Sequence, residues 1–308
     1  MAISPSTQDV VLARLKGRRV DLKGVLFEAL LLLALLLSLS ILITLMADVL
    51  RGGLGVLTER GFGFLTAGLA TFSADTAGVK QGIVGSMLTL VFVVLLAFPL
   101  GIGAAVYLEE YAPDTTFTRF INVNIRNLAG VPSIVYGLLG LALFVEVFRP
   151  LTGGTTAISG GLTLAVLVLP IVVITAAEAL RAVPDSIREA GFGVGATRWE
   201  VVRSHVLPSA APGILTGTVL SISRALGETA PLLLVGAITG YIATGGQSLV
   251  EQMRSSFTTL PTVVYSYARL PSQDFREVTS AAIIVLLAVI LLVNAIAIVL
   301  RNRYERKW

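Results

Sequence analysis

The sequence has 308 residues, of which 55% are hydrophobic and only 14% charged, with a formal charge of +4 and a mean hydropathy of +0.86. Soluble domains carry about 25% charged residues, so this composition excludes a water-soluble globule and predicts a membrane protein. Without cysteine and with a single histidine, His205, the chain cannot form a disulfide or a Cys/His metal cluster. Positive charge in membrane proteins usually marks the cytoplasmic side, so we expect no nucleic-acid partner.

Six stretches are long and apolar enough to cross a bilayer as helices, which takes about 20 residues each. These stretches are residues 25–47, 82–107, 127–148, 155–177, 212–238 and 278–300. The first is longer than the apolar part of a signal peptide and lacks a convincing cleavage site, so we interpret it as a retained span. The sequence therefore predicts an all-α protein with six transmembrane helices.

The distribution of Lys and Arg predicts the orientation. With both termini inside, 15 of these residues fall on the cytoplasmic side and 7 on the outside. This asymmetry favours cytoplasmic termini. The expected organisation is a cytoplasmic tail (1–24), a first span with an external loop (25–81), a core of five spans (82–300) and a second tail (301–308).

Prolines interrupt the apolar windows at Pro99, Pro132, Pro170 and Pro231. A proline removes one helix hydrogen bond and kinks the chain. Nearby glycines allow close approach of helices. Two interpretations stay open, namely ordinary helix packing and kinks that flex during transport.

Residues 181–211 form the longest charged segment between spans and resemble two short helices. Pro184 suits the first position of one helix, and three glycines between 191 and 195 break the run. Thr197 and Glu200 fit a capping box that begins the second helix, which we expect Pro208 to end. Phe192, Val194, Trp199 and Val202 are the expected apolar contacts. A solvated loop is the alternative, and a DNA-binding helix-turn-helix is disfavoured because a basic recognition face is lacking.

This segment resembles the signature of ABC importer permeases, which reads Glu-Ala-Ala, three residues, Gly, nine residues and Ile-x-Leu-Pro. The chain has Glu189-Ala190-Gly191, then Gly195, then His205-Val206-Leu207-Pro208. Gly191 and His205 depart from the pattern, while the spacing is complete. The resemblance implies a type I importer permease in which Glu189, Ala190, Gly195, Leu207 and Pro208 couple the chain to a separate ATPase.

ATP is expected to act through that partner. The chain has no Gly-x-x-x-x-Gly-Lys-Ser/Thr loop, and none of its four lysines lies in such a context. We therefore expect a transport subunit without catalytic residues, metal or cofactor of its own.

The fifth window carries Arg224 near its midpoint, about 18 Å from the end of a helix that rises 1.5 Å per residue. A charge at that depth costs at least ~2.5 kcal/mol. Glu228 lies four residues later on the same face and can pair with it. Together with Gly217 and Ser221 these residues form a polar stripe. Two interpretations remain, namely a structural ion pair and an anion site in which the guanidinium matches phosphate geometry.

A second resemblance concerns the same segment. Arg224-Ala-Leu-Gly-Glu228-Thr229-Ala-Pro231 is similar to the Gly-Glu-Thr-Ala-Pro signature of PstA-type phosphate importer permeases, and residues 130–137 (GVPSIVYG) are also similar to that family. The resemblance covers roughly residues 82–300. It implies that Arg224, Glu228, Ser221 and Thr229 belong to the substrate pathway.

The same resemblance implies a set of partners in the cytoplasmic membrane. These are a paralogous PstC-type permease in a heterodimer, a PstB-type ATPase dimer and an external PstS-type phosphate-binding protein. An importer of another oxyanion is the main alternative. An ion channel would not explain the coupling segment, and a membrane enzyme would need a catalytic set that the sequence lacks.

Overall fold

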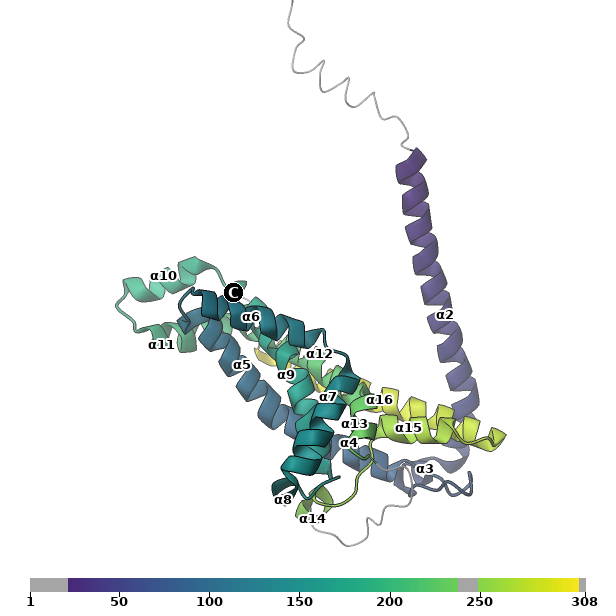
Figure 1. The fold of residues 1–308 in the computed structure, drawn as a ribbon. Helices are drawn as coiled ribbons and strands as arrows, with labels where there is room; N and C mark the ends of the chain where they lie inside the picture. The colour runs from purple at the N-terminus through teal and green to yellow at the C-terminus, as the bar shows by residue number, and fades with distance from the viewer. Residues whose placement is uncertain (1–21, 238–248, 305–308) are drawn as a thin grey trace, which may run out of the picture. The chain divides into compact units, whose positions relative to one another are not determined.

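The computed structural model describes residues 22–237 and 249–304, and these residues form helices without a strand (Figure 1). The chain divides into two compact units, residues 1–49 and 50–308. The long apolar helices run as follows: α2 (Leu22–Arg60), α4 (Lys80–Phe92) with α5 (Phe98–Val106), α9 (Ala157–Arg181), α12 (Leu207–Gly227) and α16 (Gln273–Tyr304). The shorter helices are α3 (Phe62–Thr66), α6 (Thr116–Ala129), α7 (Ser133–Gly140), α8 (Arg149–Thr152), α10 (Asp185–Gly193), α11 (Arg198–Val201), α13 (Ala230–Leu234), α14 (Leu249–Met253) and α15 (Leu260–Ala268).

Four π-helical turns interrupt or extend these helices. They are η1 (Val93–Ala97), η2 (Tyr107–Tyr111), η3 (Leu141–Val147) and η4 (Val202–Val206). Each ends two or three residues before a proline. The helix continues past the proline after η1 and η4, whereas it ends after η2 and η3, before Pro113 and Pro150. Because proline has no N–H and its ring crowds the preceding turn, a wider turn before it can accommodate the ring.

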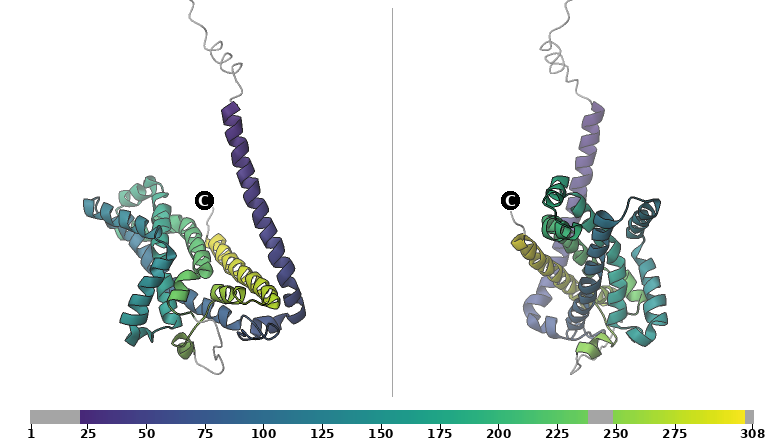
Figure 2. Two further views of the ribbon diagram at one scale, coloured as in Figure 1. Left: turned by 45° about the vertical axis from the view of Figure 1, so that its right-hand side comes forward. Right: turned by 90° about the vertical axis from the view of Figure 1, so that its left-hand side faces the viewer.

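Among the residues that the structure describes, five continuous helices are long and apolar enough to cross a membrane, and a sixth span is obtained if α6 and the helix from Ser133 to Val147 are counted together. That pair bends by 100°. The predicted number of six spans is thus confirmed if this bent pair is counted as the third span. In the unit formed by residues 50–308, α10 and α11 lie at one end and α8 and α14 at the opposite end (Figures 1 and 2).

The predicted fifth window, 212–238, is wrong at its C-terminal end. The helix runs without a break from Arg198 to Gly227 and stops there, and residue 238 lies outside the described residues. The cause is Pro231, which has no N–H to donate to the carbonyl of Gly227 four residues earlier and whose ring crowds that carbonyl. A separate short helix, α13, begins at Ala230 with this proline in its first turn.

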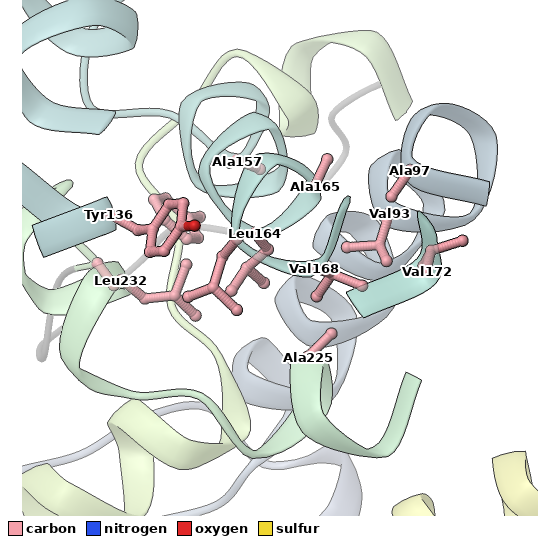
Figure 3. Close-up of a cluster of buried hydrophobic side chains, with 13 residues drawn as sticks. Val93, Ala97, Tyr136, Ala157, Leu164, Ala165, Val168, Val172, Ala225 and Leu232 are labelled. Carbon is pink, nitrogen blue, oxygen red and sulfur yellow. The ribbon is translucent and has the colours of Figure 1, made fainter. Parts of the chain in front are cut away.

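Helix α9 is the centre of the larger unit. It packs against α4, α5, α7 and α12, and 67% of its apolar window is buried, against 6% for α16. Figure 3 shows Leu164 and Val168 of α9 between Tyr136 and Leu232 on one side and Val93 and Ala97 on the other. Small residues make this possible, since a Cβ at Gly101 would lie 2.7 Å from Val172 of α9.

Candidate substrate pathway and coupling site

The break after Gly227 places Arg224 in the last turn of α12. Glu228 follows with extended backbone (φ −74°, ψ 127°), and Thr229 precedes α13. Backbone groups at such a break lack helix partners, and membrane proteins tolerate them where they are buried in protein or line a cavity. The break therefore places polar groups within an otherwise apolar span.

Arg224 and Glu228 form the ion pair that the four-residue spacing predicted. The Arg224 Nε lies 3.3 Å from the Glu228 Oε1. The two side chains differ in exposure, with 44% of Arg224 and 15% of Glu228 accessible. Arg224 makes no hydrogen bond to another residue among those the structure describes. Its guanidinium, with five N–H donors, can therefore reach a ligand while it stays close to a compensating charge.

The two segments similar to PstA-type permeases meet at this break, although about 90 residues separate them. Gly137 of α7 faces Pro231 of α13 so closely that a Cβ would lie 2.7 Å from the Pro231 Cα. Tyr136 is buried, and its hydroxyl donates to the carbonyl of Leu128 at 2.8 Å, across the bend between α6 and α7. The bent third span and the broken fifth span thus share one site.

The other predicted pathway residues are placed differently. Ser221 is fully buried, and its hydroxyl donates to the carbonyl of Gly217 at 2.9 Å. Gly217 itself packs on Thr175 of α9, where a Cβ would collide with the threonine side chain. Thr229 is half-buried. Gly217 and Ser221 therefore lie at the contact with α9, and the role of Ser221 in a pathway stays a prediction.

The coupling segment has two helices joined by a turn, as the sequence predicted, but only α10 is short, since α11 is the start of the helix that runs from Arg198 to Gly227. Thr197 Oγ1 accepts from the Glu200 N–H at 3.4 Å, and the Glu200 carboxylate accepts from the Thr197 N–H at 2.8 Å, which confirms the capping box. Gly195 takes up the turn with a φ of 84°, a conformation that favours glycine. The Glu200 carboxylate also accepts from the Thr197 hydroxyl at 2.8 Å. The bonds that the carboxylate accepts, first from the Thr197 N–H and then from the hydroxyl, hold the pKa of Glu200 below its ordinary value.

Three details of the predicted coupling segment are wrong. Pro184 precedes α10 as its N-cap and is not its first residue. Pro208 does not end the second helix, because η4 widens before it and the helix continues into α12. Val202 is buried and unavailable to a partner, since it lies on the inner side of this turn.

The surface offered by the coupling segment is partly apolar. Phe192, Val194 and Trp199 are exposed. Of the residues with a predicted coupling role, Glu189, Ala190, Gly195 and Pro208 are exposed and Leu207 is half-buried. The departure at Gly191 has a local reason, because a Cβ there would lie 2.7 Å from Val201 on the second helix. Helices α10 and α11 therefore cross more closely than an alanine would allow.

Sequence reasoning missed the residues that hold this segment in place. Glu109 pairs with Arg181 at 3.1 Å, Glu110 pairs with Arg188 at 2.8 Å, and the guanidinium of Arg198 lies 5.3 Å from the centre of the Tyr111 ring. Consecutive acidic residues at the end of a span were the available signal. Asn294 was also missed, and it accepts a hydrogen bond from Ser223 at 2.8 Å, which ties α16 to α12.

The described residues contain no group of three or more His, Cys, Asp or Glu side chains that could hold a metal ion. The site at the break combines an arginine and a carboxylate with backbone groups that lack helix partners.

Comparison with known proteins gives the family. Residues 97–308 match the family described as binding-protein-dependent transport system inner membrane component. The chain belongs to this family. It is 35% identical to the phosphate transport system permease protein PstA of Pasteurella multocida over 226 residues, 72% of this chain and 76% of that protein. It is 37% identical to the probable ABC transporter permease protein YqgI of Bacillus subtilis over 201 residues, 65% of this chain and 66% of that protein.

The fold agrees with this family. A chain of a bacterial ABC transporter involved in the import of the acidic polysaccharide alginate has a TM-score of 0.64 and 14% identity, with 92% of this chain and 97% of that one covered. The resemblance stated from the sequence motifs is thereby confirmed. This family member is a multi-pass protein of the cytoplasmic membrane and a transport subunit, whose ATPase and substrate-binding protein are separate partners.

Proposed function

We propose that this chain is the PstA-type permease subunit of an ATP-driven phosphate importer. In the proposed assembly it pairs with a PstC-type permease in the membrane, with a PstB-type ATPase dimer below residues 181–211 and a PstS-type phosphate-binding protein outside. The similarity to PstA of Pasteurella multocida supports the substrate. Both chain termini are proposed to be cytoplasmic, as the Lys and Arg distribution predicts. Residues 82–300 are the proposed permease core.

The observation that carries the substrate proposal is the exposed arginine at a meeting of two helix breaks. A guanidinium keeps its charge at any working pH and presents a planar fork of donors that matches phosphate oxygens. Discontinuous helices near the middle of the membrane commonly line substrate sites in transporters. Arg224 is 44% exposed at the helix break after Gly227, beside the bend between α6 and α7.

Glu228 explains how such a site can pass an anion without trapping it. With the ion pair formed at 3.3 Å, the site is neutral before phosphate arrives. An arriving phosphate binds the guanidinium of Arg224 and is repelled by the nearby carboxylate of Glu228, so binding is weak. Weak binding suits a transport path, because a substrate must be able to leave as well as enter. Ser221 and Thr229 are proposed to complete the path in other conformations of the cycle.

Transport is proposed to follow alternating access. ATP binding closes the ATPase dimer, whose groove holds the exposed surface of α10 and α11, with Glu189, Ala190, Gly195, Leu207 and Pro208 in the coupling role. The spans then open outward to the binding protein, and hydrolysis resets them. An importer of another oxyanion is the second candidate, favoured by the same arginine, because sulfate also matches a guanidinium fork.

Uptake by the reconstituted complex tests the substrate and the pathway together. ATP-dependent uptake of radiolabelled phosphate into liposomes is measured with and without excess sulfate, for wild type and Arg224→Gln. We expect phosphate uptake that sulfate does not inhibit and a loss of about 100-fold in the variant, as when one preorganised donor to an anion is removed. Assembly and ATPase activity should persist.

Arg119→Gln is the matched control, since Arg119 lies in an exposed ion pair with Asp114 at 2.9 Å, far along the chain from the break. This variant should transport as the wild type does. Uptake of sulfate in place of phosphate would overturn the substrate proposal. Loss of assembly in Arg224→Gln would assign Arg224 to a structural ion pair.

A further inference from the structure

Three consecutive residues at the end of the second span each contact a different arginine of the coupling segment. Glu109 contacts Arg181 at the end of α9, Glu110 contacts Arg188 in α10, and the ring of Tyr111 contacts Arg198 in α11. Consecutive side chains on a helix point about 100° apart. One flat surface therefore cannot meet all three, and the coupling segment wraps around the end of η2. We call these six residues the coupling clamp.

The central pair of the clamp, Glu110 and Arg188, is largely buried, and the guanidinium of Arg188 donates to several acceptors. The side chains of Glu110 and Arg188 are 7% and 18% exposed. Arg188 also donates to the carbonyl of Leu180 at 2.9 Å, in the last turn of α9, and to that of Val183 at 2.8 Å, in the turn after it. The hydrogen bonds that Arg188 donates to Glu110 raise the pKa of Arg188 above its ordinary value. One guanidinium thus joins the end of α9, the start of α10 and the end of the second span.

The clamp connects directly to a membrane helix. The π turn η2 continues α5 without a break, and the helix from Lys80 to Tyr111 is one continuous span. The opposite faces of α10 and α11 are exposed and carry Phe192, Val194 and Trp199. A force applied to that outer surface therefore reaches α5 through the contacts of Glu109, Glu110 and Tyr111.

We propose that the coupling clamp is the link that transmits nucleotide-driven movement of the ATPase from residues 181–211 to the second span, with Glu110 and Arg188 as positioning residues. This inference rests on the proposed function, because it assumes that an ATPase moves the segment. Without the clamp, α5 keeps its apolar contacts around Ala105 with Val201 and Val206, but it follows the movement of α10 and α11 less closely. The result is ATP hydrolysis with little transport.

A distance measurement tests the link without reference to the substrate. The chain has no cysteine, so spin labels can be placed at Ser204→Cys and Leu100→Cys, exposed positions on the coupling segment and on α5 that lie outside the apolar surface of α10 and α11. In the assembled complex with the clamp intact, we expect ATP analogues to leave this distance unchanged, because the two parts move together. In Glu110→Gln, the distance should shift when the nucleotide binds.

Transport assays in the same complexes give the functional readout. We expect Glu110→Gln to keep its ATPase activity and to lose about 10-fold in phosphate taken up per ATP hydrolysed, an effect of the size found when a coupling contact is removed. Asp114→Asn is the matched control, because Asp114 lies four residues further along in an exposed pair with Arg119. It should leave both the distance and the ratio unchanged.

If Glu110→Gln does not assemble, Glu109→Gln replaces it, since the Arg181 of that pair is half-exposed at 49% and its loss is better tolerated. An unchanged distance and an unchanged ratio in the assembled variant would overturn the proposal. A wild-type complex that hydrolyses ATP and does not import phosphate would overturn the proposed function alone, because the distance measurement would still report on the clamp.

Discussion

Two arginine–glutamate pairs of this protein differ in how much of the arginine remains available to other partners. Arg224 pairs with a residue four positions away, at 3.3 Å, and keeps 44% of its side chain accessible. Arg188 pairs with a residue 78 positions away, at 2.8 Å, and also donates hydrogen bonds to the carbonyls of Leu180 and Val183. The first arginine can bind something else, while the second can only hold the fold in one arrangement.

Replacing each arginine should therefore lower the stability of the complex by a different amount. Arg188→Gln leaves Glu110 as a buried charge without its partner, which costs about 3–5 kcal/mol. Arg224→Gln removes one member of an accessible pair, which costs about 1 kcal/mol or less. Thermal unfolding of the purified complex, followed by the loss of its size-exclusion peak, measures both. Equal losses of stability would contradict the contrast between the two pairs.

Closer packing in the coupling segment provides the next largest effect. In Gly191→Ala, the new methyl group lies 2.7 Å from Val201, so α10 and α11 must separate. The expected loss is about 1–3 kcal/mol. Gly103→Ala in α5 is the matched control, because nothing lies within 4 Å of its Cβ position. A stability of Gly191→Ala equal to that of the control would show that the close crossing is not needed.

A smaller effect is expected at the helix cap of the same segment. Thr197→Ala removes the acceptor for the Glu200 N–H and should cost about 1 kcal/mol. Hydrogen exchange of residues 198–201 should become faster, because the first turn of α11 loses its hydrogen-bond acceptor. Exchange of α9 should stay as in the wild type. Faster exchange throughout the chain would instead indicate general unfolding.

The smallest expected effect is a pH dependence of this cap. The pKa of Glu200 is lowered by hydrogen bonds from Thr197, so the carboxylate form is favoured in the folded chain. Its contribution to stability is present above the ordinary value of 4.5 and is lost as the pH falls through the lowered folded value. Trp199, next to Glu200, can report the change by fluorescence. The signal should stay flat in Glu200→Gln over the same range, because this side chain does not titrate, and a transition that persists in this variant would assign it to another group.

Local pattern was enough to predict much of the two regions. The Arg224–Glu228 pair and the Thr197–Glu200 capping box both join residues within four positions, and helix geometry alone brings such residues together. The spans were predictable because a bilayer requires long apolar helices. The end of the fifth span was not, since the window of apolar residues continued past the break that Pro231 imposes.

By itself the sequence determined the membrane class, the apolar spans, the paired helices of the coupling segment and the motifs that gave the family, because each depends on residues close together in the chain. Only the tertiary structure decided that GVPSIVYG and the Arg224 segment meet, that Ser221 lies against α9, and that Glu109, Glu110 and Tyr111 hold the coupling segment. These contacts join residues that lie far apart in the sequence. They depend on how kinked helices pack around α9, and no local periodicity encodes that packing.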